Sequence, residues 1–342
     1  MIRAAIVGMG WWGRTIARDL SQSTVIRPLL GIDPDAGGRD AAVALGMRAA
    51  EDFDAALQAP DIDAVVLCTP HRFHADQIEL AARAGKHVFC EKPLCLTGAD
   101  VRRAVTAVKT AGVTLGIGHE RRFEPAMIEL RQRFKAGEFG EILQIEANFS
   151  QDKFFALPPD NWRLSPELAP NGPLTATGIH LVDLAIACLG LPQTVWARLA
   201  TRGSNFANGD TLGIMLGFPG GANALISAML ATPFVGRFAV FGSKGWMEIR
   251  DRTHPELPTG WDVGVCHRNG TPQMHFFAPH PAVRANLEAF ATAAMGGTAY
   301  PVGTDEMLAN VFTLEAINRS VAGGGLVSPD SLDLSDSPVA PR

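Results

Sequence analysis

The chain has 342 residues, of which 47% are hydrophobic and 19% are charged, and its formal net charge is -5. This length suits two domains, each large enough to bury its own core. The acidic balance leaves no basic surface for nucleic acid, and no uncharged apolar run approaches the ~20 residues that a membrane helix needs. We therefore expect neither nucleic acid nor a membrane as a partner.

The N-terminus and the cysteines indicate a reducing compartment. Residues 1–3 lead directly into a predicted strand, which leaves no room for the apolar region of a signal peptide. The number of cysteines is odd and no C-x-x-C pair occurs, so neither a disulfide framework nor a zinc site is favoured. We expect a cytoplasmic protein whose thiols are Cys68, Cys90, Cys95, Cys188 and Cys266.

The first predicted strand, Ala4 to Val7, ends in a glycine-rich turn that is typical of dinucleotide binding. Gly8 permits the sharp turn, and Gly10 lets a pyrophosphate approach the backbone. Gly13 lets the helix from Arg14 to Leu20 pack on the sheet with its N-terminal amides toward the phosphates. The alternative is a turn that binds no phosphate. The turn residues expected at the cofactor are Gly8, Met9, Gly10, Trp11, Trp12 and Gly13.

A second strand, Val25 to Ile32, ends at Asp33, twenty positions after the last glycine of the turn. Its carboxylate can accept hydrogen bonds from the hydroxyls of an adenosine ribose, and its charge repels a 2′-phosphate. Asp33 therefore predicts NAD rather than NADP.

Helices and strands then alternate as in a doubly wound parallel sheet of Rossmann type. We place this α/β domain at residues 1–121. Its further strands are expected at 64–68, 88–90 and 113–118, and its further helices at 38–45, 52–58, 71–84 and 98–109.

From residue 122 the pattern changes to consecutive strands, which indicates an α+β domain with a large, mostly antiparallel open sheet. We place this domain at 122–327, followed by a loose tail at 328–342. An open apolar sheet face favours a homo-oligomer, either dimer or tetramer. The expected strands are 142–149, 195–201, 211–218, 222–230 and 237–241, and the expected helices are 126–135, 179–188, 282–295 and 306–321.

Three polar residues are candidates for chemistry. Lys92 follows a strand at the cofactor crevice, where burial and a cationic nicotinamide would lower its pKa, although a surface pair with Glu91 explains it equally well. His180 and Asp183 lie three apart on an apolar helix, so they face a cleft or satisfy each other in a core. His254, His267, His275 and His280 lack metal-ligand spacing and are interpreted as loop residues, so we expect no metal.

Taken in order, these residues resemble the Gfo/Idh/MocA family, the glucose-fructose oxidoreductase and inositol dehydrogenase group, over nearly the whole chain. The motifs that carry the resemblance are Gly8-x-Gly10-x-x-Gly13, Thr69-Pro70-His71-x-x-His74, Glu91-Lys92-Pro93, Arg122-Phe123-x-Pro125, Trp162-Arg163 and Gly178-x-His180-x-x-Asp183.

The resemblance implies hydride transfer between NAD(P) and a hydroxyl or carbonyl carbon, with Lys92 and His180 as the catalytic pair. It places Thr69, Pro70, His71, His74, Glu91 and Lys92 at the nicotinamide end, and Trp162 and Arg163 as a pair that reaches back to the cofactor. The expected substrate contacts are Lys92, Arg122, Arg163, Thr177, His180 and Asp183.

One position departs from the family. Members commonly carry an aspartate four residues before the histidine, and this chain has Ala176. That carboxylate would orient the histidine or bind a substrate hydroxyl. Thr175 and Thr177 offer hydroxyls but no negative charge, so the family's proton relay does not transfer whole.

We therefore expect an NAD-dependent oxidoreductase that acts on a secondary alcohol of a sugar, cyclic polyol or cyclic diol. Lys92 and His180 share the acid–base work, and which of them takes the proton stays open. One alternative is an NADPH-dependent reductase of a ketosugar or aldehyde, for which only Arg39 lies near Asp33. Another is a non-catalytic sensor that binds the dinucleotide, which the change at Ala176 permits.

Overall fold

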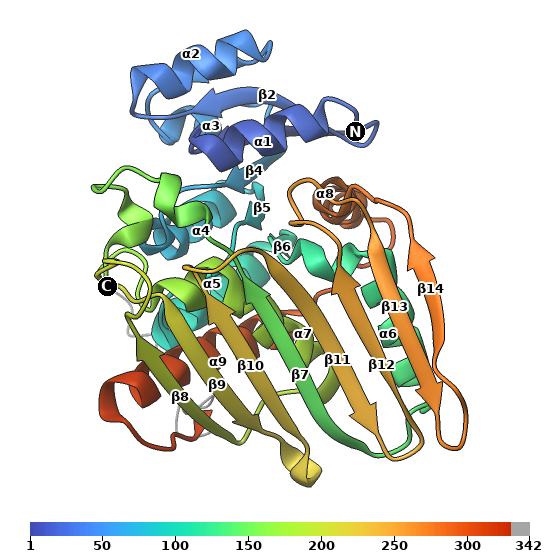
Figure 1. The fold of residues 1–342 in the computed structure, drawn as a ribbon. Helices are drawn as coiled ribbons and strands as arrows, with labels where there is room; N and C mark the ends of the chain where they lie inside the picture. Colours follow the sequence, from blue (N-terminus) through green and yellow to red (C-terminus); the bar gives the residue numbers. More distant parts are fainter. Residues whose placement is uncertain (330–342) are drawn as a thin grey trace.

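The computed structural model describes residues 1–329, so all but the first two positions of the predicted tail lie outside the described residues. Figure 1 shows a smaller sheet above a larger one, with the chain passing from the first to the second. Within residues 1–329, no helix is both long and apolar enough to cross a membrane.

The first sheet is parallel throughout and has the Rossmann strand order, which confirms the predicted α/β class. In the described part of the chain its order is β3-β2-β1-β4-β5-β6, so the crevice at the switch between β1 and β4 lies beside the glycine-rich turn. Its strands are β1 (Ile2–Val7), β2 (Ile26–Ile32), β3 (Arg48–Ala50), β4 (Ala64–Leu67), β5 (His87–Cys90) and β6 (Leu115–Ile117).

The helices around this sheet lie close to their predicted places, with one difference that affects the site. Helix α1 begins at Trp11, three residues earlier than predicted, because Gly10 takes the extended backbone of an N-cap. Both tryptophans therefore belong to the first turn of the helix. The helices are α1 (Trp11–Leu20), α2 (Ala36–Ala44), α3 (Asp54–Gln58), η1 (His71–Phe73), α4 (His74–Arg83) and α5 (Gly98–Ala111).

The second sheet is antiparallel except where β10 runs parallel to β7, as the α+β prediction requires. Among the described residues its order is β14-β13-β12-β11-β7-β10-β9-β8. Its strands are β7 (Ile142–Ser150), β8 (Thr194–Ala200), β9 (Thr211–Gly217), β10 (Asn223–Met229), β11 (Val235–Gly242), β12 (Gly245–Asp251), β13 (Trp261–His267) and β14 (Gln273–Phe277).

The interpretation of His267 and His275 as loop residues was wrong. His267 ends β13, and His275 lies in β14. Strand β14 is at the sheet edge and largely exposed, so it lacks the apolar alternation that identifies a half-buried strand. Its place depends on the ladder with β13, which pairs Val263 with His275.

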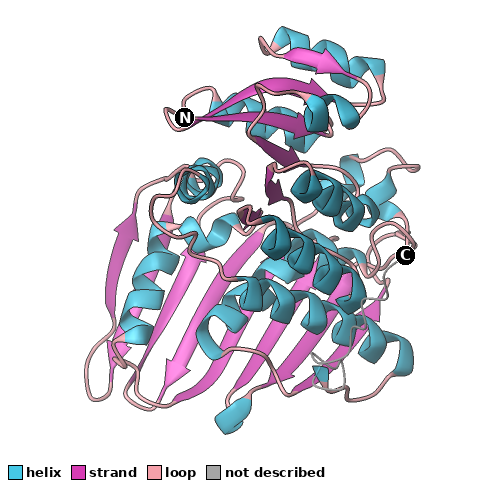
Figure 2. Cartoon of the chain, turned by 180° about the vertical axis from the view of Figure 1, so that it is seen from behind, coloured by secondary structure: helices cyan, strands magenta, loops and turns pink. Residues whose placement is uncertain are grey.

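Helices cover one face of the second sheet, as the view from behind shows (Figure 2), and leave the other face open (Figure 1). A π-helix, η5 (Leu174–Gly178), leads into α7 at the upper end of this layer. The helices are α6 (Pro125–Lys135), α7 (Ile179–Leu189) and α9 (Thr304–Gly323), with shorter turns η2 (Glu120–Phe123), η3 (Lys153–Ala156), η4 (Trp162–Leu164) and η6 (Pro219–Gly221).

Helix α8 (Ala282–Ala294) returns to the first sheet instead of covering the second. Its residues Leu287 and Phe290 belong to the same hydrophobic cluster as Ile6 and Phe89, and the rings of Phe290 and Phe89 lie 5.6 Å apart. The late part of the chain therefore packs into the core of the first sheet.

Candidate active site

The glycine-rich turn has two closely packed positions and one open position. Gly8 has a φ of +92°, and a Cβ there would lie 2.8 Å from the Cys68 carbonyl oxygen. A Cβ at Gly13 would lie 2.0 Å from the Gly8 oxygen, whereas a Cβ at Gly10 would meet no atom within 4 Å. Helix α1 begins at this open position without a side-chain cap. The turn therefore fits a dinucleotide pyrophosphate, which would bind its free amides.

Asp33 lies directly against the turn. Its Oδ2 accepts a hydrogen bond from the Met9 backbone N at 2.7 Å, and its Oδ1 accepts one from the Asp35 backbone N at 2.9 Å. The Arg39 guanidinium donates to the carbonyl oxygens of Asp33 and Pro34. A carboxylate therefore stands where the ribose of a bound dinucleotide would follow the phosphates.

A cavity of about 960 Å³, which includes its opening to solvent, lies between the carboxyl ends of β4 and β5 and the residues of η5 and α7. It brings together residues that are far apart in the sequence. Those that the sequence predicted for the site are Trp11, Trp12, Thr69, His71, Glu91, Lys92, Trp162, Arg163, Thr177 and His180.

The same cavity has a second set of lining residues that sequence reasoning missed. Glu120 has a signal that could have found it, because it follows β6 at the carboxyl edge of a parallel sheet, where ligands bind. Phe149 lies in β7, Phe154 lies in η3, and the other three lie on loops, so their place at the cavity depends on long-range contacts. The missed polar and aromatic residues are Glu120, Phe149, Gln151, Phe154, His254 and Glu256.

Lys92 crosses from the first sheet to the second domain. Its Nζ donates hydrogen bonds to the carbonyl oxygens of Ala176, at 2.7 Å, and Thr175, at 3.4 Å. Burial lowers the pKa of Lys92, while the carboxylates of Glu120 and Glu91 act in the opposite direction. The amine is therefore held at a fixed place on the cavity wall and loses its proton more readily than a surface lysine.

His180 lies on the first turn of α7 and is 3% exposed. Its Nδ1 is 3.7 Å from Oε2 of Glu120, and its ring centroid is 5.7 Å from that of His119. Burial and the neighbouring charge of Lys92 hold the pKa of His180 well below its usual range. The imidazole is therefore neutral at physiological pH and able to accept a proton.

Glu120 lies at the start of η2, with its Oε2 3.7 Å from Nδ1 of His180. Burial and the nearby charge of Glu91 raise its pKa and Lys92 lowers it, so that the pKa is about 7. A carboxyl group with this pKa exchanges its proton near neutrality, which an ordinary glutamate does not.

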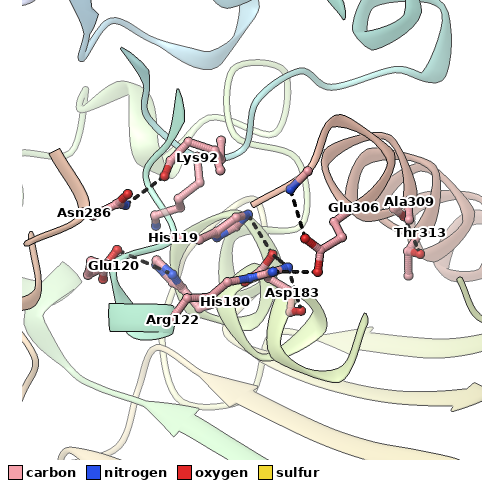
Figure 3. A network of polar contacts seen from close by, with 12 residues as sticks. Lys92, His119, Glu120, Arg122, His180, Asp183, Asn286, Glu306, Ala309 and Thr313 are labelled. Atoms are coloured by element: carbon pink, nitrogen blue, oxygen red, sulfur yellow. Dashed lines mark hydrogen bonds and ion pairs between the residues drawn. The ribbon is translucent and has the colours of Figure 1, made fainter. Parts of the chain in front are cut away.

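Arg122 and Asp183 are not among the lining residues of the cavity, so its geometry gives no support to the substrate contacts predicted at these two positions. Arg122 donates to both oxygens of Asp183, at 2.6 and 2.7 Å, and to Oε1 of Glu306 at 2.7 Å. Figure 3 shows this group, which we name the closed network (Arg122, Asp183 and Glu306). The sequence left open whether Asp183 faces a cleft or lies in a core. Its carboxylate pairs with Arg122 inside the core, where both polar groups have partners.

His74 and Pro70 are likewise not among the lining residues. His74 is fully buried, and its two ring nitrogens lie 2.9 Å from the carbonyl oxygens of Pro93 and Thr69. It therefore ties the loop after β4 to the loop after β5. The role predicted for His74 beside the cofactor stays a prediction.

Two residues of η4 in the second domain, Trp162 and Arg163, line the cavity. The Arg163 guanidinium lies 4.4 Å from the centre of the Trp162 ring, and that ring packs edge-on against His71 at 4.9 Å. Burial lowers the pKa of Arg163, while Glu91 raises it. A guanidinium held in this way can meet an oxygen of a bound ligand.

Known proteins match both halves of the chain. Residues 2–119 match the description "Oxidoreductase family, NAD-binding Rossmann fold", and residues 127–248 match "GFO/IDH/MocA C-terminal domain". D-xylose 1-dehydrogenase (NADP(+)) 2 of Haloferax volcanii is 31% identical over 317 residues, covering 92% of this chain and 90% of that protein. Inositol 2-dehydrogenase of Rhizobium meliloti is 30% identical over 331 residues, covering 94% and 97%.

A solved structure agrees with these matches. The aldose-aldose oxidoreductase from Caulobacter crescentus, complexed with glycerol, superposes with a TM-score of 0.85 at 29% identity and covers 96% of this chain and 99% of that one. The matches include the glycine-rich turn in the first half and the sheet in the second, and they confirm the resemblance drawn from the motifs. The chain belongs to the Gfo/Idh/MocA family of oxidoreductases.

Proposed function

We propose that this protein transfers a hydride between NAD and the secondary carbinol carbon of a sugar, cyclic polyol or cyclic diol. The observation that carries the proposal is the convergence of Lys92 and His180 on one cavity that also reaches the first turn of α1. A bound nicotinamide would supply the hydride acceptor. The sugar and polyol names of the two relatives support the substrate class.

In this proposal the chain's own residues handle the proton and the substrate. Lys92 and His180 are the groups able to take the hydroxyl proton, because burial favours the neutral form of each. Arg163 and Thr177 bind the substrate oxygens. The Thr177 hydroxyl already donates to the Pro173 carbonyl oxygen at 3.2 Å, so it offers a lone pair to a substrate hydroxyl.

The choice of NAD over NADP rests on Asp33. Its carboxylate is held against the turn by the Met9 amide, where it would repel a 2′-phosphate. One relative is named for NADP(+), so relatives differ in this respect. A 2′-phosphate would need a cation near Asp33. Arg39, which follows Asp33 in the sequence, already donates to the backbone oxygens of Asp33 and Pro34.

The test is a panel of sugars, inositols and cyclic diols, each assayed with NAD and with NADP by the absorbance of the reduced cofactor at about 340 nm. We expect turnover with at least one cyclic polyol or sugar and a higher kcat/KM with NAD. A protein that binds NADH yet reduces no cofactor with any member would contradict the proposal and favour the sensor alternative.

We also propose a homo-oligomer that uses the open face of the second sheet. Large apolar side chains are exposed on the strands of this sheet, and such a patch is usually covered by a partner. Light scattering of the purified protein measures the assembly, with a monomer as the contrary result. The exposed residues are Trp196, Met215, Leu225, Met274 and Phe276.

A reducing compartment, the cytoplasm, is the proposed location. All five cysteines lie within the described residues and are free thiols. Proteins of oxidising compartments tend to use their cysteines in disulfides. Localisation of a tagged chain by cell fractionation tests this, and recovery from an oxidising compartment would contradict it.

A further inference from the structure

Glu120 has no part in the family resemblance, yet it lies 3.7 Å from His180 and interacts electrostatically with Lys92. It follows β6 in the first domain, whereas His180 begins α7 in the second. The dashed line in Figure 3 joins Glu120 to His180, with Lys92 extending toward the same region. Glu120 is 12% exposed and lines the cavity. We name Lys92, Glu120 and His180 the open cluster.

The contact involves one specific nitrogen of the imidazole. Nδ1 of His180 is buried without a hydrogen-bond partner, and Oε2 of Glu120 is the carboxylate oxygen 3.7 Å away. This distance is longer than a hydrogen bond, which needs about 3 Å. A hydrogen bond between the two groups therefore requires their side chains to move closer together.

We propose that Glu120 is the positioning residue that sets the tautomer of His180. Ionised, it accepts a hydrogen bond from Nδ1–H, so that the lone pair on Nε2 is available to the substrate. It acts through His180, and the proposal rests on the proposed function.

The step that follows balances. The substrate O–H bond breaks and its proton goes to Nε2, while the C–H electron pair leaves as hydride to the NAD of the proposed function and a C=O bond forms. The imidazolium keeps its Nδ1–H on Glu120, whose charge stabilises it, and later returns the Nε2 proton to water. The carboxylate orients and stabilises without becoming protonated itself.

The residue at position 176 explains why His180 needs a carboxylate from elsewhere. Ala176 lies four residues before His180, and its methyl group supplies no charge to the imidazole. Its backbone oxygen is instead the acceptor for Lys92. The carboxylate of Glu120 reaches the same imidazole from the other domain, so the site has a negative charge that the motif alone does not provide.

The charged groups that face Glu120 come from four places in the fold. Glu91 and Lys92 follow β5, Arg121 is its neighbour in η2, Glu124 caps α6, and His180 lies on α7. Glu91 disfavours the ionised form of Glu120, while Lys92 and Arg121 favour it. Burial outweighs these charges and raises the pKa to about 7, so the orienting hydrogen bond is lost as pH falls below neutrality.

The direct test observes the tautomer in the protein without substrate. Nitrogen NMR of the 15N-histidine-labelled chain distinguishes Nδ1–H from Nε2–H, and the signal of His180 among nine histidines is assigned by its loss in His180→Gln. We expect the His180 signals to move toward the Nδ1–H form as pH rises from 6 to 8. We expect Glu120→Gln to abolish this pH-dependent change of the His180 signals and Glu120→Asp to keep part of it.

The control is Glu306→Gln, a carboxylate-to-amide change in the closed network that does not touch the cavity. We expect this variant to keep the pH-dependent change of the His180 signals. Identical His180 signals in the wild type and Glu120→Gln across this pH range would overturn the proposal.

A second readout uses the rate. With a substrate from the panel, Glu120→Gln lowers kcat by about tenfold or more at pH 8 and removes the fall in rate below pH 7. An unchanged profile overturns the role of Glu120. If the wild type turns over no substrate, the proposed function fails, and the NMR result still decides whether Glu120 sets the tautomer.

Discussion

The closed network and the open cluster lie next to each other and each contain cationic and carboxylate side chains (Figure 3). Most of these side chains are buried, although Glu306 is 30% exposed. In the closed network, charged nitrogen and oxygen atoms meet at 2.6 to 2.7 Å. In the open cluster, the carboxylate and the imidazole stop at 3.7 Å, and burial raises the carboxyl pKa to about 7. Complete pairing makes each partner costly to remove, whereas incomplete pairing leaves groups able to exchange protons.

The first way to break this comparison is to remove a charge from the closed network. Asp183→Asn leaves the Arg122 guanidinium buried with one weaker partner, so we expect a loss of about 3 kcal/mol in the free energy of unfolding. Denaturant titration measures it. Glu306→Gln is the milder control, because Glu306 is 30% exposed and water can replace its contact. A stability loss for Asp183→Asn no larger than for Glu306→Gln would show that the network is not closed.

The second way compares two lysines that bind carbonyl oxygens. Nζ of Lys86 donates to the oxygens of Ala59 and Ile62, both at 2.8 Å, and does not line the cavity. We expect Lys92→Ala to lower kcat by at least ~10²-fold, because Lys92 shares the acid–base work with His180 and such work contributes that much. Lys86→Ala should lose stability and keep its rate. Similar rates in the two variants would remove the catalytic role of Lys92.

The third way compares two glycines of the same turn. Gly10→Val places a side chain in open space, so the fold should hold while NADH binding weakens by roughly tenfold or more. Gly8→Val puts a β-branched residue at φ +92° and against the Cys68 carbonyl, so it should destabilise the fold itself. Fluorescence titration and thermal unfolding separate the two effects. Undiminished NADH binding by Gly10→Val would contradict the placement of the phosphates.

Local sequence was sufficient for the features that depend on neighbouring residues. The glycine spacing, Asp33 and the position of Lys92 after a buried strand all follow from runs of a few residues, and the alternation of strands and helices predicted the first sheet. Gly10, which must stay bare for a ligand, is open in the structure. These features belong to a continuous segment, so no long-range contact is needed to derive them.

Long-range contacts decided what local sequence could not. A polar residue on an apolar helix is compatible with a cleft or with a core, and only the position of Arg122 places Asp183 in the core. Glu120 and His180 come from different domains, and only the packing of the whole chain brings them within 3.7 Å of each other. No periodicity in residues 282–294 says which sheet they cover.

The most direct test of the account is the stability of Glu120→Gln at pH 8. In the wild type the folded-state pKa of Glu120, about 7, lies above its ordinary value of 4.5, so the folded protein loses stability as pH rises from about 4.5 to 7. Glutamine carries no charge, so the variant does not lose stability through ionisation of a buried group. If Glu120 instead paired with neighbours as Asp183 does, its replacement would destabilise the fold. We predict that Glu120→Gln is more stable than the wild type at pH 8, by on the order of 1 kcal/mol, and about equal to it at pH 5. A variant less stable than the wild type at pH 8 would contradict the account, because Glu120 would then be a structural partner like Asp183.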